Sequence, residues 1–222
     1  MAGRITALKA QAKNRGRVNV YLDGAFAFAL SDLVAATLRV GQWLSDEEIA
    51  DLQQRQAAQR AYDRALRFLS YRPRSVDEVN RYLAGKQVPD DLIAQTVDRL
   101  QQAGLLDDET FARFWVENRE SFRPRGKAAL RYELRRKGLG EEAIQAAIQD
   151  VDESEGAYRI AQAQAQRLAG VDRQAFRQRL GGYLSRRGFS YGVIRETIER
   201  LWQERATRQS AEGSKPSEGS RR

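Results

Sequence analysis

Residues 134–148 read LRRKGLGEEAIQAAI, and this stretch decides the fold because two other stretches match it without a gap. Residues 83–97 read LAGKQVPDDLIAQTV, and residues 184–198 read LSRRGFSYGVIRETI. In each, a leucine is followed by a basic residue at +3 and by apolar residues at +5, +10 and +14. A period of about 50 residues is typical of tandem structural repeats, which bury their apolar faces by stacking on neighbours. The sequence therefore predicts three related helical units.

Each unit is expected to contain three helices. The predicted ranges are 57–70, 75–85 and 90–103, then 108–121, 124–137 and 141–151, then 154–169, 173–187 and 190–206. Gly138 and Gly188 stand where a left-handed residue ends a helix, and Pro73 and Pro124 suit the first turn of the helix that follows. In the first unit Gln87 replaces the glycine, so a turn of different shape is expected there.

The first 30 residues follow a different pattern, with apolar residues at every second position. This alternation predicts strands near 4–12, 17–22 and 25–30, with a type I′ turn at Asp23-Gly24. A short helix follows Ser31, and the capping box at 45–48 opens a longer helix. The predicted fold is mainly α, with three tandem three-helix repeats in an elongated arrangement after a small antiparallel β segment. The predicted divisions are 1–45, 46–106, 107–152, 153–206 and a disordered tail at 207–222, which has few apolar residues.

Composition restricts the chemistry. The chain has 222 residues, a net charge of +8 and neither cysteine nor histidine. Disulfides, thiolate nucleophiles, His/Cys zinc sites and histidine acid–base catalysis are excluded. We expect no cofactor, no metal and no enzymatic activity, and we interpret Asp107-Asp108-Glu109 as a helix cap. The positive charge favours an anionic partner. Without an 18-residue apolar run or an apolar leader, we expect a cytoplasmic protein with no membrane partner.

The charge is unevenly distributed. Residues 119–137 contain eight basic and two acidic residues, and residues 172–187 contain five arginines and one aspartate. By contrast, residues 140–155 contain six acids and no base, and residues 90–109 contain six acids and one arginine. Part of this acidity is explained by carboxylates that cap helix N-termini. The middle helices are thus basic, and the third helices begin with acids.

Lys127, Arg131 and Arg135 are four residues apart, which places them on one face of a helix. Such a stripe fits the phosphates of a nucleic acid without reading its bases, although a solvated helix face gives the same pattern. Aromatic residues at helical spacings, Tyr132 among them, are interpreted mainly as core residues. The candidate partner- or DNA-binding residues are Arg72, Arg74, Arg123, Arg125, Lys127, Arg131, Arg135, Arg136 and Lys137.

Several segments are characteristic in combination: LRFLSYRPRS (66–75), GLLDDETFA (104–112), and RPRG (123–126) followed by ELRRKG (133–138). Together they resemble the bacterial regulatory RecX family. RVNVYLDGAFAF (17–28) is similar to the leading segment of many members. No single motif is decisive, and the resemblance lies in their order and spacing over about 60–203.

The resemblance implies a regulator of the RecA recombinase that takes part in DNA repair and the SOS response. The resemblance also implies that the protein lies in the groove of the RecA–DNA filament and lowers its ATPase, recombinase and coprotease activities. The expected partners are RecA, the RecA–DNA filament and DNA backbone without sequence preference, bound by a monomer. The alternatives are a stand-alone DNA-binding protein, a helical scaffold for an acidic protein and, least favoured, a carboxylate-dependent nuclease.

Overall fold

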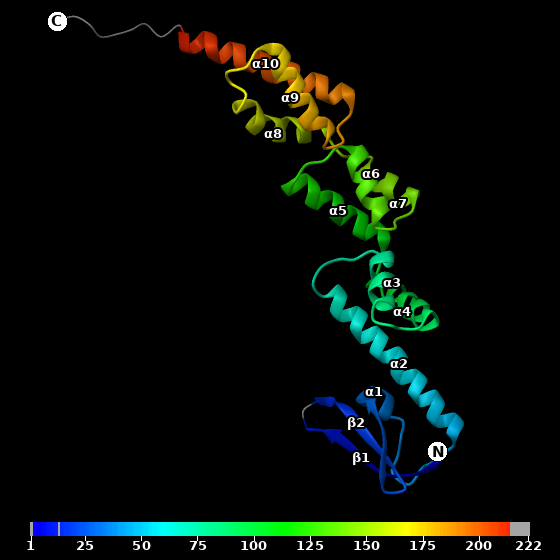
Figure 1. Cartoon of the computed structure of the whole chain (residues 1–222). Helices are drawn as coiled ribbons and strands as arrows, with labels where there is room; N and C mark the ends of the chain where they lie inside the picture. The colour runs from blue at the N-terminus through cyan, green and yellow to red at the C-terminus, as the bar shows by residue number, and fades with distance from the viewer. Residues whose placement is uncertain (1, 13, 214–222) are drawn as a thin grey trace, which may run out of the picture. The chain divides into compact units, whose positions relative to one another are not determined.

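The computed structural model describes residues 2–12 and 14–213, which belong to two compact units, 1–106 and 107–222 (Figure 1). The predicted fold class is confirmed: the protein is mainly helical, and three three-helix repeats follow an N-terminal antiparallel sheet. Repeat 1 belongs to the first unit, whereas repeats 2 and 3 belong to the second.

The N-terminal sheet has the strand order β3-β2-β1-β4. Its region comprises β1 (Gly3–Gln11), β2 (Asn14–Leu22), β3 (Ala25–Ser31), the short helix α1 (Asp32–Ala35) and β4 (Trp43–Leu44). The three predicted strands are present, and Asp23 and Gly24 have φ values of 48° and 89°, as a type I′ turn requires. The fourth strand was not predicted, because its two residues are too few to show alternation. It pairs with Gly3 and Arg4.

A single helix, α2 (Asp46–Leu69), leads from the sheet into repeat 1. Ser45 and Glu48 form the predicted capping box at its start. The sequence predicted two helices here, but no glycine or proline interrupts these 24 residues, so the helix continues. Its first half packs on the sheet through Ile49 and Leu52, and its second half supplies Ala65 to the core of repeat 1.

The remaining helices follow the predicted order. They are α3 (Val76–Ala84) and α4 (Asp90–Gln102) in repeat 1, α5 (Asp108–Phe122), α6 (Lys127–Arg136) and α7 (Glu141–Ile148) in repeat 2, and α8 (Glu153–Gln166), α9 (Arg173–Ser185) and α10 (Tyr191–Gly213) in repeat 3. The final helix is longer than predicted and includes 207–213 of the predicted disordered tail. The rest of that tail, 214–222, lies outside the described residues.

Both prolines lie outside the helices that they were predicted to begin. Pro73 precedes the N-cap Ser75, and Pro124 precedes the N-cap Gly126, by two residues in each case. The oxygen Oγ of Ser75 accepts a hydrogen bond from the amide of Glu78 at 3.2 Å, which caps α3. Gly126 has no capping side chain, and its amide is used instead for a contact with repeat 3, described below.

The turn after the middle helix is the same in all three repeats. The amides of Val88, Leu139 and Phe189 donate to the carbonyls of Leu83, Leu134 and Leu184 at 3.2, 3.3 and 3.5 Å. The residue before each of these amides is left-handed, with φ of 58° at Gln87, 83° at Gly138 and 79° at Gly188. These bonds define the Schellman motif that ends many helices. The expectation of a different turn in repeat 1 is therefore wrong, because Gln87 adopts the conformation that glycine adopts elsewhere.

Each repeat has its own apolar core, and the aligned residues occupy it. Leu83, Leu134 and Leu184 are all fully buried. The interpretation of the aromatic residues as core residues holds for Phe111 and Phe176, which are fully buried. It is wrong for Tyr132, which is 62% exposed on the outer face of α6.

Two glycines allow repeats 2 and 3 to approach closely. The amide of Gly126 donates to the carbonyl of Arg187 at 2.9 Å. A Cβ atom on Gly126 would lie 2.0 Å from the carbonyl oxygen of Gly188, and a Cβ atom on Gly188 would lie 2.5 Å from the side chain of Ala129. The glycine of the RPRG motif is therefore required by the contact between repeats.

Candidate nucleic-acid interface

The predicted basic stripe of α6 faces α7. The Nζ atom of Lys127 donates to the carbonyl of Gln149 at 2.6 Å, and Nη2 of Arg131 donates to Oε1 of Gln145 at 2.6 Å. Glu141 lies 3.1 Å from Nε of Arg131 and 2.7 Å from Nη2 of Arg135. The three side chains do share one face, as predicted. However, they hold the two helices together, so the stripe is not simply a row of free cations.

Pairing with these arginines lowers the pKa of the Glu141 carboxyl. The hydrogen bond from Arg135 is the main cause that lowers the pKa of Glu141 from its ordinary value, with the charges of both arginines adding to it. The carboxylate is exposed to solvent, so its interaction with the arginines is screened. Its position at the start of α7 also suits the helix dipole.

The other basic residues near α6 gather around one carboxylate and one indole. Glu133 accepts hydrogen bonds from Nε1 of Trp115 at 2.8 Å and from Nε of Arg119 at 2.7 Å, and it lies 3.7 Å from Nε of Arg125. The ammonium group of Lys137 lies 4.8 Å from the centre of the Trp115 ring. This cluster joins α5 to α6.

Arg123 and Arg136 are more exposed. Arg123 follows the last residue of α5, and Arg136 lies 5.9 Å from the centre of the Tyr132 ring. The structure thus distributes the candidate residues of repeat 2 over several sides of α6 and the loop before it.

The two candidate residues of repeat 1 are also held internally. Arg72 donates to both carboxylate oxygens of Glu78, at 3.1 and 2.9 Å. The guanidinium of Arg74 stacks over the Phe68 ring at 3.9 Å. Burial lowers the pKa of the Arg74 guanidinium from its ordinary value, and the positive charge of Arg72 lowers it further. These residues orient the segment between α2 and α3.

Asp107 confirms the interpretation of the acidic cluster as a cap. Its Oδ1 atom accepts hydrogen bonds from the amides of Glu109 at 2.7 Å and Thr110 at 3.0 Å. The bond from Thr110 is the main cause that lowers the pKa of Asp107. Within residues 2–12 and 14–213, no group of three or more acidic side chains is placed to hold a metal ion.

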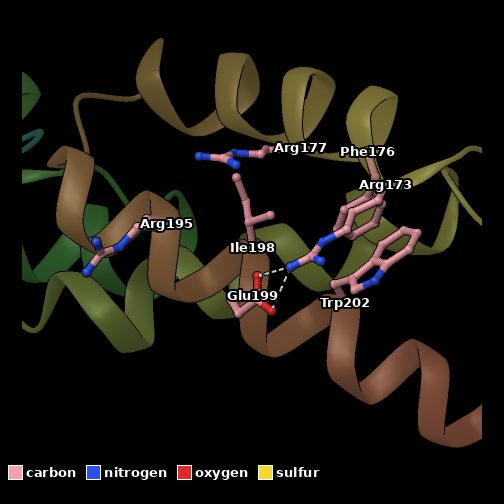
Figure 2. A pocket seen from close by; sticks show the side chains of 7 residues that line it. All are labelled: Arg173, Phe176, Arg177, Arg195, Ile198, Glu199 and Trp202. Carbon is pink, nitrogen blue, oxygen red and sulfur yellow. Dashed lines mark hydrogen bonds and ion pairs between the residues drawn. The ribbon is translucent and has the colours of Figure 1, made fainter.

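A groove between α9 and α10 was missed by the sequence reasoning. It has a volume of about 550 Å³, and its lining includes Arg177, Gly181 and Ser185 of α9 together with Tyr191 and Arg195 of α10. It adjoins a smaller hollow, shown in Figure 2, that is lined by Phe176, Trp202 and the ion pair between Arg173 and Glu199. Arg177 and Arg195 line both.

The two arginines of the groove differ from those of repeat 2. Both are exposed, and neither has an ion pair, hydrogen bond or ring contact with any described residue. Figure 2 shows them extending from α9 and α10 on the same side of Ile198, away from the ion pair. The groove therefore presents, beside an apolar floor, two guanidinium groups that have no partner among the described residues.

The repeat alignment explains this difference and could have identified the groove. A shift of 50 residues, set by Leu134 and Leu184, places Arg131 on Gly181 and Glu141 on Tyr191. Gly181 and Tyr191 therefore cannot form the ion pair that Arg131 and Glu141 form between α6 and α7. The same shift places Gln145 on Arg195.

The fold and this surface together define a class: a basic protein of tandem three-helix repeats, with arginine-rich middle helices in repeats 2 and 3. Four family models match the chain in order. They are the regulatory protein RecX N-terminal domain at 3–45, and the first, second and third RecX three-helix domains at 61–100, 107–148 and 151–198. The chain belongs to the RecX family of regulatory proteins.

Individual proteins agree with this assignment. The regulatory protein RecX of Bacillus subtilis is 31% identical over 202 residues, covering 89% of this chain and 76% of that protein. RecX of Lactobacillus delbrueckii subsp. bulgaricus is 37% identical over 155 residues, which cover 69% of this chain. That match spans 57% of the Lactobacillus protein.

Solved structures agree as well. A crystal structure of regulatory protein RecX has a TM-score of 0.75 and 28% identity, covering 89% of this chain and 99% of its own. RecX from Lactobacillus salivarius shares the fold, with a TM-score of 0.61, 23% identity and coverage of 65% and 96%. No helix in the described part of the chain is both long and apolar enough to cross a membrane.

Proposed function

We propose that the protein regulates RecA by binding the RecA–DNA filament and lowering its ATPase, recombinase and coprotease activities in DNA repair and the SOS response. The observation that carries this proposal is the ordered match of all four RecX domains to one chain. The net charge of +8 supports a phosphate-rich target, because lysine and arginine bind nucleic acid by displacing counterions.

Binding by several repeats would make the attachment strong although each contact is modest. When two binding modules are linked, the second binding step becomes intramolecular, and the overall affinity rises without any new contact. We propose that a cytoplasmic monomer acts in this way, without catalysis and without reading DNA sequence. The nine candidate residues are its proposed contact surface, and Arg123, Arg135 and Arg136 are the exposed ones among them.

The test is RecA ATPase on single-stranded DNA, titrated with the protein at substoichiometric amounts. Inhibition well below one copy per recombinase subunit is expected, since a filament regulator acts at few sites on a long assembly. Equal amounts of protein on an excess of bare DNA control for sequestration of DNA. If inhibition follows only the amount of free DNA removed, the proposed function is refuted.

The two arginines of the repeat 3 groove, which have no partner in the described part of the chain, favour a second candidate, a stand-alone DNA-binding protein that competes for DNA. Binding to RecA in the absence of DNA separates the two. The competitor should show no such binding, whereas the filament regulator should retain it at physiological salt.

A further inference from the structure

We propose that the groove between α9 and α10 binds single-stranded DNA, with Arg177 and Arg195 holding phosphates and the floor receiving an unstacked base. This inference names a nucleic-acid site within the proposed function and rests on it. The site differs from the stripe of α6, whose cations already have partners within the chain.

The charges of the groove suit phosphate. Guanidinium groups offer paired donors that match phosphate oxygens, and an arginine without an internal partner loses no ion pair when it binds. Arg177 and Arg195 meet this condition among the described residues. The acid on their border, Glu199, is occupied by Arg173, with Nη2 2.9 Å from Oε2. The free charge of the groove is therefore positive.

The shape of the groove suits a base. Phe189, Ile194 and Ile198 provide an apolar lining, while Tyr191 is 73% exposed at the edge. Aromatic side chains stack on bases without regard to sequence, and single-strand binding sites combine such platforms with basic grooves. Bases inside a duplex are not available for this contact, so the groove favours a single strand.

Polar groups in the lining can also pair with the edges of a base. Gln174, Gln178 and Ser185 lie beside the arginines and can both donate and accept hydrogen bonds. Base edges present donors and acceptors together, so these side chains can pair with them.

Comparison with repeat 2 gives a way to close the groove without changing net charge. The double variant Gly181→Arg with Tyr191→Glu would install the pair that Arg131 and Glu141 form in repeat 2. A Cβ atom on Gly181 would lie 3.6 Å from Cδ1 of Ile198, an ordinary contact. Arginine is also a better helix former than glycine, so this variant should fold.

The experiment measures binding of a fluorescent oligodeoxythymidine by anisotropy over a series of salt concentrations. R177Q/R195Q should bind at least about tenfold more weakly, since each lost charge-assisted contact is worth roughly a factor of ten. Its salt slope should fall by about 1.4, or roughly 0.7 for each phosphate contact on a single strand. G181R/Y191E should also lose affinity, because the groove is filled although the net charge is kept.

The matched control is R60Q/R179Q, which removes two exposed arginines outside the groove, on α2 and on another face of α9. It should bind nearly as the unaltered protein does, and urea unfolding checks that all variants are folded. If the groove variants bind DNA as the control does, the proposal is overturned. It is also overturned if R177Q/R195Q loses binding to an acidic peptide such as polyglutamate while its DNA affinity is unchanged.

The experiments give different outcomes when filament regulation fails and when the DNA-binding groove fails. An unaltered protein that binds the oligonucleotide through the groove, yet does not inhibit the recombinase ATPase, would refute filament regulation and support the groove. An unaltered protein that inhibits the ATPase, with groove variants that bind and inhibit equally well, would refute only the groove.

Discussion

Replacing Gln87 by glycine should stabilise the protein. Gln87 has φ of 58°, in a turn where the equivalent residues of repeats 2 and 3 are glycines. This conformation lowers the stability of the folded protein by roughly 1–2 kcal/mol when the residue has a Cβ atom. Glycine avoids that cost, but its greater freedom in the unfolded chain lowers stability by about 0.5–1 kcal/mol. The expected net gain is about 0.5–1 kcal/mol. The side chain of Gln87 is exposed, so little packing is lost on its removal.

The measurement is the free energy of unfolding from urea titrations followed by circular dichroism. Gln87→Ala is the matched control, because alanine shortens the side chain but keeps the Cβ atom, so its stability should stay close to that of the unaltered protein. The reverse change, Gly138→Gln, should cost about 1 kcal/mol or more. The reasoning fails if Gln87→Ala stabilises as much as Gln87→Gly, since the gain would then not come from φ.

Three further changes test other contacts. Gly126→Ala should cost about 1–3 kcal/mol in urea unfolding, because its Cβ atom would overlap the backbone of Gly188, while Gly192→Ala, where a Cβ atom has nothing within 4 Å, should not destabilise. Glu133→Gln should cost about 1–3 kcal/mol, because the indole and guanidinium groups around it lose a charged acceptor; an unchanged free energy of unfolding would contradict this. Glu141→Gln should lower the free energy of unfolding at neutral pH. The difference in this free energy between the variant and the unaltered protein should shrink as pH falls below 4.5, the ordinary pKa of the carboxyl, and through the lower pKa of the folded protein. A difference that stays constant down to pH 3 would refute the pairing.

The sign of the pH effect follows from the direction of the pKa shift. The pKa of Glu141 is lower in the folded protein than in the unfolded chain. The carboxylate therefore contributes its stability above the unfolded pKa, and this contribution is lost as pH falls through the folded pKa. Substitution by glutamine removes the charge at every pH, so the two proteins should converge in acid.

The repeats were predictable because their buried residues and helix ends recur at regular spacings in the sequence. The same spacing separates Leu83, Leu134 and Leu184 from the left-handed residue that ends each middle helix. This spacing identifies the turn in all three repeats, including repeat 1, where the left-handed residue is not glycine. At Gln87, the residue type suggested a different turn, but the contacts of the repeat determine the backbone. Tertiary contacts override local preference at single positions.

The partners of the basic stripe were not predictable from one helix. The positions of Lys127, Arg131 and Arg135 follow from helical spacing, but the acceptors that face them lie on the next helix. Carboxylates that cap helix N-termini explain part of the acidity around Glu141, and the sequence of α6 alone does not indicate that Glu141 pairs with its arginines. The groove of repeat 3 exists because Gly181 and Ser185 stand where repeat 2 has the long side chains of Arg131 and Arg135. Such a feature becomes visible only when one repeat is compared with another.

The unbroken course of α2 has a consequence for how the N-terminal half unfolds. Ile49 and Leu52 belong to the core of the sheet, and Ala65 belongs to the core of repeat 1, yet all three lie on one hydrogen-bonded helix. Local opening of either core would expose one end of the same helix. Amide hydrogens of the strands and of repeat 1 should therefore exchange with solvent as one cooperative group, with a shared opening free energy. The N-terminal sheet is thus less a detachable module than a part of the folding unit of repeat 1.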